Sequence, residues 1–362
     1  MSEDTDGPQA AGRTGQPIGS RKRARTDGLP TPQSGLPQAS ILRAAYFPHI
    51  LERIMAHSSL AALLVLRASS KYYKAKVDGL LGNGVHLVVT STTASSAAAS
   101  VRRLGHHNDQ GVPSTPFLLA LVTVPEFRGA INEYIASEIM GSCHQDIRAV
   151  RLPQYRGRYI RFPVSHTLVV SCDAYLHKGF DPPTEALVLW SAIPACVTKL
   201  VVNIGVNELV QCPTIDTRTV RMFLKYPFNV KELVLVFRPS DIPLRLVAPF
   251  PTVAGDNDSR RNLHDELYRC VQAYVTGNVR VTLVDCALLF YRRRAVSINE
   301  AEKEIRSRFR RAATSALKDC DEQIVRRFGF RIKVDTVLRF FTPEEYNEEV
   351  GDEQYQIETY ID

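Results

Sequence analysis

Few residues in this sequence combine side-chain types at a spacing that would support catalysis. The neighbours Cys143 and His144 lack a third ligand at a spacing useful for a metal. Three acids follow predicted strands, a position where α/β enzymes often have catalytic acids: Asp173, Asp241 and Asp285. Asp is also an ordinary turn residue, and we interpret all three as turn residues. Glycine-rich phosphate loops, nucleophile elbows and H-E-x-x-H zinc motifs are absent from the sequence. We therefore expect no intrinsic enzymatic activity, no cofactor and no metal.

A basic stretch is the second candidate for chemistry. Residues 292–333 carry 13 Lys and Arg against 6 Asp and Glu, whereas 343–362 carry 8 acids and no base. The arginines could face a phosphate backbone, but acids share the stretch and the apolar stripe of its predicted helix already accounts for packing. We interpret the basic residues as a solvated helix face, and we do not expect nucleic acid as a partner.

Composition places the chain among ordinary globular proteins. Its 362 residues are 44% hydrophobic and 23% charged, and the length favours two structured units. Apolar runs stay short of the roughly 18–20 residues that a membrane span needs, and the first residues lack the apolar core of a secretory signal. Seven scattered cysteines fit reduced thiols. We expect a nuclear or cytoplasmic protein that does not enter a membrane.

Residues 1–40 are predicted to be a disordered tail, because they are nearly empty of large apolar side chains. The tail contains a basic cluster, Arg21, Lys22, Arg23 and Arg25. Short exposed clusters of this kind serve as nuclear localisation signals. A solvated basic patch without such a role explains them equally well, and the sequence leaves both interpretations open.

Residues 41–83 predict a compact helical unit. Apolar residues recur at helical spacing in three short runs, each bounded by turn or capping residues. Such short helices bury little surface alone, so the unit needs a neighbour or a partner. Residues 84–115 predict a flexible connection, since Ser, Ala, Gly and His dominate most of this range.

Residues 116–362 predict an α/β domain with a largely parallel sheet, although an α+β arrangement stays open. Helices are expected over 126–140 (using Phe127), from Leu263 to Tyr274, from Ile298 to Leu317 and after a Thr342–Glu345 capping box. Strand spacing is irregular, which argues against a regular solenoid and leaves a degenerate leucine-rich repeat open. The expected strands are 166–171, 185–190, 198–203, 232–237, 279–284 and 331–340.

The helical unit at 47–81 resembles an F-box, the motif through which substrate-recognition subunits bind a Skp-type adaptor in cullin-based ubiquitin ligases. Phe47-Pro48 takes the place of the family's opening Leu-Pro, whereas Ile50, Ala68 and Tyr72 depart from the family's acid, Val and Trp. The whole layout is similar to fungal F-box-like proteins. The resemblance implies these adaptor-binding residues: Phe47, Pro48, Leu51, Ile54, Met55, Leu63, Leu66 and Tyr72.

Two functions follow from these patterns. The resemblance implies a non-catalytic adaptor that binds a Skp-type adaptor and cullin scaffold through the helices, and an unknown protein substrate through the α/β domain. The alternative is a small-molecule α/β enzyme or ligand-binding protein whose N-terminal helices cap its own sheet. An adaptor-binding unit should leave Leu51, Ile54, Leu63 and Leu66 partly exposed, whereas a cap would bury all four.

Overall fold

The computed structural model describes residues 48–82, 84–93, 96–104, 110–128, 133–143, 147–153, 166–173, 196–206, 214–216, 229–239, 260–289 and 297–359. The predicted tail and its basic cluster, and the strand expected at 185–190, lie outside these residues. By its internal contacts the chain divides into two compact units, Met1–Glu52 and Arg53–Asp362. In this division residues 53–81 fall in the same unit as the sheet.

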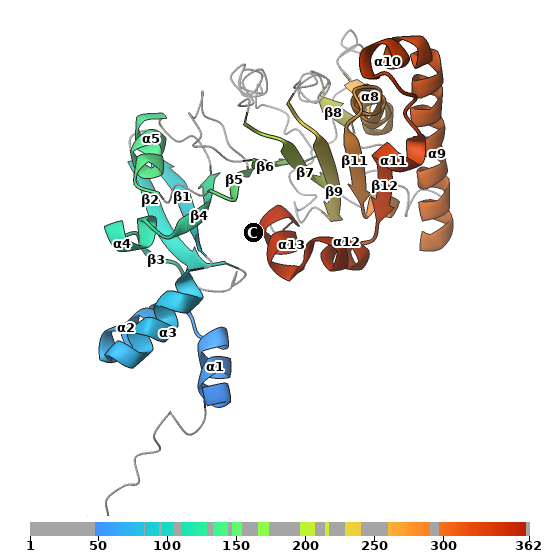
Figure 1. Cartoon of the computed structure of the whole chain (residues 1–362). Coiled ribbons are helices and arrows are strands. Elements are labelled where there is room, and N and C mark those ends of the chain that lie inside the picture. Colours follow the sequence, from blue (N-terminus) through green and yellow to red (C-terminus); the bar gives the residue numbers. More distant parts are fainter. Residues whose placement is uncertain are drawn as a thin grey trace, which may run out of the picture. The chain divides into compact units, whose positions relative to one another are not determined.

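Three helices open the described part of the chain, as the apolar spacing predicted (Figure 1). They are α1 (Pro48–His57), α2 (Leu60–Ser69) and α3 (Lys71–Leu81). Ser59 caps α2 by accepting a hydrogen bond from the Ala62 amide, and Ser70 caps α3 by accepting one from the Tyr73 amide. Helices α2 and α3 therefore each begin where a serine satisfies one free amide of the first turn.

A sheet of ten strands forms the core of the second unit. Its order across the sheet is β12-β11-β9-β7-β6-β5-β4-β1-β2-β3. The pairs from β1 to β12 are parallel, and β2 and β3 add antiparallel strands at one edge. The strands are β1 (Val85–Thr93), β2 (Ser96–Arg103), β3 (Val112–Pro113), β4 (Val122–Arg128), β5 (Ala149–Pro153), β6 (Thr167–Asp173), β7 (Lys199–Val206), β9 (Glu232–Pro239), β11 (Arg280–Val284) and β12 (Leu338–Phe341).

Helices and short elements occupy the connections between the strands, and two further helices follow β12. They are α4 (Pro116–Leu119), α5 (Glu133–Gly141), α8 (Leu263–Thr276), the 3₁₀ helix η3 (Cys286–Leu289), α9 (Ile298–Asp319), α10 (Asp321–Phe328), α11 (Val334–Val337), α12 (Pro343–Val350) and α13 (Asp352–Thr359). The strands β8 (Thr214–Asp216) and β10 (Arg260–Asn262) pair separately. The fold is thus α/β, with N-terminal helices followed by a mostly parallel mixed sheet.

The parallel strands follow one another across the sheet in chain order, so that the colours in Figure 1 run from cyan at β1 to red at β12. Equivalent residues form ladders, such as Leu168, Leu200 and Leu233 on neighbouring strands. Runs of consecutive buried residues in β7 and β9 indicate that both faces of the sheet are covered there. On one face, Tyr346 of α12 and Ile357 of α13 join the core cluster of strand valines.

Three local predictions need correction. Residues 84–115 predicted a flexible connection, yet their described part forms β1, β2 and β3, because pairing to a buried neighbour stabilises even the small residues of β2. Phe127, predicted in a helix, lies in β4 and is fully buried. The strand expected at 331–340 begins only at Leu338, since Val334–Val337 forms the helical turn α11.

Candidate partner-binding surface

Buried leucines hold α2 in the second unit and fix which side of this helix faces outwards. Leu60 and Leu63 are fully buried, as is Met55 in the last turns of α1. Val77 and Leu81 supply the buried side of α3, which packs against α2. The opposite sides of these helices are left to solvent, and they are the surface on which a partner would act.

Arg103 of β2 fixes the C-terminal end of α1. Its Nη1 atom donates hydrogen bonds to the carbonyl oxygens of Met55, Ala56 and Ser58 at 3.1, 2.9 and 2.9 Å. The last carbonyls of a helix have no partners within the helix and carry its negative dipole end, so a guanidinium stabilises them in two ways. Arg103 therefore holds the last turn of α1, next to the exposed Ile54.

Arg67 joins α2 to its neighbours. Its Nε lies 2.6 Å from Asp78 Oδ1 of α3, and its guanidinium lies 4.2 Å from the centre of the Phe117 ring of α4. Both contacts are partly exposed, so each contributes a modest energy. The first contact links α2 to α3, and the second links α2 to α4.

Exposed apolar side chains are concentrated on these three helices. Among the described residues, seven large hydrophobic side chains are exposed, and four of them lie on α1–α3. Single exposed hydrophobic residues are ordinary, but a concentration on one short segment is typical of a protein-binding surface. The four are Ile50 (46% exposed), Ile54 (56%), Val65 (72%) and Tyr72 (46%).

The residues that the F-box resemblance predicted divide into two groups. Pro48, Ile54 and Tyr72 are exposed, and Leu51 and Leu66 are half-buried. Met55 and Leu63 are buried, so the expectation that Leu63 would be partly exposed is wrong: Leu63 lies three residues after Leu60 on the same buried side of α2. Phe47 and the predicted localisation residues Arg21, Lys22, Arg23 and Arg25 lie outside the described residues.

Sequence reasoning missed Val65, the most exposed large hydrophobic residue among those described. A signal for it existed, because α2 reads LAALLVLRAS and is apolar almost all the way round. A helix that is apolar on every side is either fully buried or needs a further partner. Since the buried side of α2 is already defined by Leu60 and Leu63, the surplus apolar residues fall on its outer side.

Buried charges also occur, on β1, β4 and β5. The Glu126 carboxylate lies 3.0 Å from His86 Nε2, 2.5 Å from Arg128 Nε and 3.1 Å from Arg151 Nε. Burial alone would raise the pKa of Glu126, but Arg151, the His86 hydrogen bond and Arg128 hold it below its usual value. Burial lowers the pKa of His86, the opposite direction to the effect of Glu126. In the described contacts, no nucleophilic side chain lies against these residues. The cluster links the neighbouring strands β1, β4 and β5 through ion pairs.

Asp285 was weighed in the sequence as a catalytic acid or a turn residue. It follows β11 at φ 57°, and its carbonyl oxygen accepts a hydrogen bond from Leu288 at the start of η3. Burial, with Glu344 and Glu302 nearby, raises the pKa of its carboxyl to about 6. The described residues contain no group of three His, Cys, Asp or Glu suited to a metal. The geometry at Asp285 is that of a turn.

Comparisons with known proteins found no match, whether to protein-family models, to curated proteins or to solved structures. The F-box resemblance therefore rests on the residues quoted above alone. Within the described part of the chain, no helix has the length and apolar character required to cross a membrane.

Proposed function

We propose that this protein is a non-catalytic substrate-recognition adaptor of a cullin-type ubiquitin ligase. Helices α1–α3 would bind a Skp-type adaptor, and the sheet domain would hold the target protein. The observation that carries the proposal is the concentration of exposed apolar side chains on α1–α3, of which Ile54 and Tyr72 are residues that the F-box resemblance assigns to the adaptor. A helical cap serving only its own sheet has no need of such residues.

The sheet supports the second half of the proposal. Its parallel strands are in chain order with equivalent leucines in register, which is the arrangement expected of an irregular leucine-rich-repeat-like array. Strand starts remain unevenly spaced, so the array would be degenerate. Repeat arrays bind partners over extended surfaces. Because both faces of this sheet are covered at β7 and β9, a target would contact the strand ends and the elements that cover the sheet.

The alternative, a small-molecule α/β enzyme, has weaker support. In open α/β sheets, ligands bind at a switch point where the strand order reverses direction. Among the described parallel strands the order runs from β1 to β12 without such a reversal. Among the described residues, Asp285 is the acid that such an activity could use, since burial raises the pKa of its carboxyl to about 6.

The test is binding of the full chain to a purified Skp-type adaptor. Replacing both exposed residues, Ile54→Ala with Tyr72→Ala, should weaken binding by thirtyfold or more, since truncating an interface anchor typically costs about 2 kcal/mol. Stability should change little, because both side chains are exposed in the free protein. Calorimetric titration and thermal melting measure the two effects separately.

Two controls make the test specific. The pair Val325→Ala and Phe330→Ala removes exposed apolar side chains near α10 and should leave adaptor binding intact. Arg308→Ala removes a charge from α9 and should do the same. If the wild-type chain does not bind the adaptor at micromolar concentrations, the proposal fails and the helices serve only the protein's own fold.

A further inference from the structure

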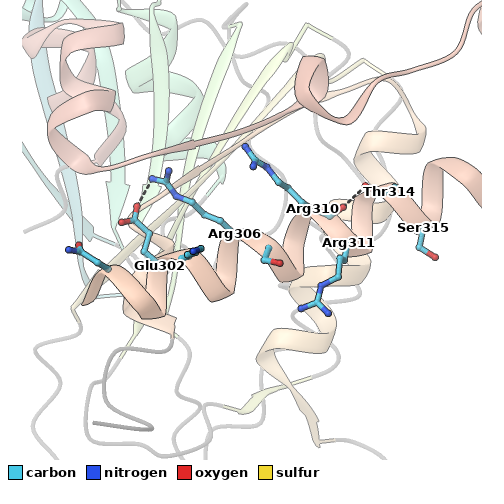
Figure 2. A pocket seen from close by; sticks show the side chains of 9 residues that line it. Glu302, Arg306, Arg310, Arg311, Thr314 and Ser315 are labelled. Carbon is cyan, nitrogen blue, oxygen red and sulfur yellow. Dashed lines mark hydrogen bonds and ion pairs between the residues drawn. The ribbon is translucent and has the colours of Figure 1, made fainter. Parts of the chain in front are cut away.

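The outer side of α9 carries an open pocket that is strongly basic (Figure 2). The described residues that line it all belong to α9 and include four cations and a single acid, Glu302. The apolar stripe of the helix, from Ala301 to Leu317, is buried on its other side. The pocket's cations are Lys303, Arg306, Arg310 and Arg311. Of these, Arg306 and Arg310 lie against Phe340 of β12, whereas Lys303 and Arg311 are exposed.

Most of this positive charge is uncompensated within the described structure. Glu302 pairs with Arg306, and Arg308, which lies outside the pocket, pairs with Glu304. No ion pair to any described residue is found for Lys303, Arg310 or Arg311. On a solvated helix face, basic residues usually have acidic residues four positions away. In this pocket only Arg306 has such a partner, Glu302.

Two of the guanidinium groups converge on one aromatic ring. Arg306 Cζ lies 5.7 Å and Arg310 Cζ lies 5.5 Å from the centre of the Phe340 ring of β12. Like charges four residues apart destabilise a helix, and the ring's attraction for cations offsets this repulsion only in part. An anion between the guanidinium groups would remove the repulsion. Functional sites often contain such unfavourable local interactions, here the repulsion between two neighbouring arginines.

The cations extend over a length suited to a polymer rather than a single ion. Lys303 and Arg310 are seven residues apart, about 10 Å along the helix axis. Figure 2 shows Arg306 and Arg310 projecting from one side of α9 and Arg311 from the other. A chain of carboxylates lying along the helix would meet a donor at each turn, and guanidinium groups bind carboxylates through paired hydrogen bonds.

We propose that this pocket binds an acidic segment of a protein. If the proposed function is correct, this acidic segment belongs to the substrate protein. Binding of an acidic segment to the pocket does not itself require the proposed function. Nucleic acid fits less well, because single-strand binders offer open aromatic faces for stacking and here Phe340 is occupied by Arg306 and Arg310.

The test uses the full chain and a fluorescein-labelled oligoglutamate peptide, followed by fluorescence anisotropy. The double variant Lys303→Gln with Arg311→Gln should bind the peptide about tenfold more weakly, because two exposed ion pairs are lost. The matched control, Arg326→Gln with Arg327→Gln on exposed α10, removes the same charge and should keep the parent affinity. Binding should weaken as salt is raised, and oligoglutamine should not bind.

Several results would overturn the inference. An equal loss in the pocket variant and the α10 control would mean that only net charge matters. Tighter binding of a single-stranded oligonucleotide would reassign the pocket to nucleic acid. Salt-sensitive self-association that the pocket variant abolishes would assign it to the acidic residues 343–353 of a second copy. Adaptor binding, measured on the same pocket variant, should be unchanged, which separates this test from that of the proposed function.

Discussion

At the scale of single residues, the most constrained group is the buried ion cluster around Glu126. A carboxylate that is fully buried costs several kcal/mol to desolvate, and this one is balanced by His86, Arg128 and Arg151. His86 lies on β1 and is itself buried. Because the arginines already compensate the carboxylate, protonating His86 adds a buried charge that has no further counterion in the described cluster.

His86 should therefore make stability depend on pH. Burial lowers its folded-state pKa below the unfolded value near 6.5, so the unfolded chain binds more protons and stability falls as pH drops below about 6.5. The loss from one histidine cannot exceed about 1.4 kcal/mol per pH unit. In His86→Gln the free energy of unfolding, measured by urea titration between pH 7.5 and 5, should fall less steeply than in the parent.

Asp285 supplies a control of opposite sign. Its folded-state pKa is raised to about 6, so the native chain binds more protons than the unfolded chain as pH falls through this range. Removing this titration with Asp285→Asn should steepen the loss of stability at low pH.

For the His86 prediction, a slope of stability against pH in His86→Gln equal to that of the parent would mean that His86 does not titrate as its burial implies.

At the scale of elements, the sequence predicted helices better than edge strands. The apolar period and capping residues placed α1–α3, α8, α9 and α12 correctly, because helical signals are local. It missed β2, SAAASVRR, whose small residues have little strand preference of their own and which forms by pairing with β1. It also extended β12 backwards over α11, since alternation in RIKVDTV is equally compatible with a helical turn.

The contact between α13 and the sheet provides a prediction for one element pair. Lys199 Nζ lies 2.6 Å from the fully buried Glu358 carboxylate, which also accepts hydrogen bonds from Tyr346 and Gln354. Lys199→Met would leave that carboxylate buried without its cation, so we expect a loss of about 3 kcal/mol in the free energy of unfolding. Chemical denaturation measures this loss.

A second substitution distinguishes charge from packing at the same contact. Adding Glu358→Gln to Lys199→Met removes the unpaired charge, and it should recover part of the lost stability. If the double variant is no more stable than Lys199→Met, the lysine contributes through packing and not through its charge.

At the scale of the whole molecule, α2, α3 and the end of α1 fall in the same unit as the sheet. The sequence located the candidate surface through a resemblance over 47–81. It could not divide the predicted residues into exposed and buried, because that division depends on how α1–α3 meet the sheet. Arg53–Asp362 forms one compact unit, and Arg103 of β2 holds the end of α1. The part of the candidate surface on residues 53–81 thus belongs to the same unit as the sheet.

Because α2 and the sheet belong to one unit, we expect a destabilising substitution in α2 to destabilise the sheet as well. Leu63 is fully buried, so Leu63→Ala should cost about 3 kcal/mol of stability through lost burial and the cavity it leaves. If Arg53–Asp362 unfolds as one unit, amide hydrogen exchange should accelerate in β7 and β9 as well as in α2 and α3. Ile54→Ala, at an exposed position, should leave exchange in the sheet unchanged. Acceleration limited to residues 48–81 would show instead that the helices unfold independently, as a separate domain ending near residue 83 requires.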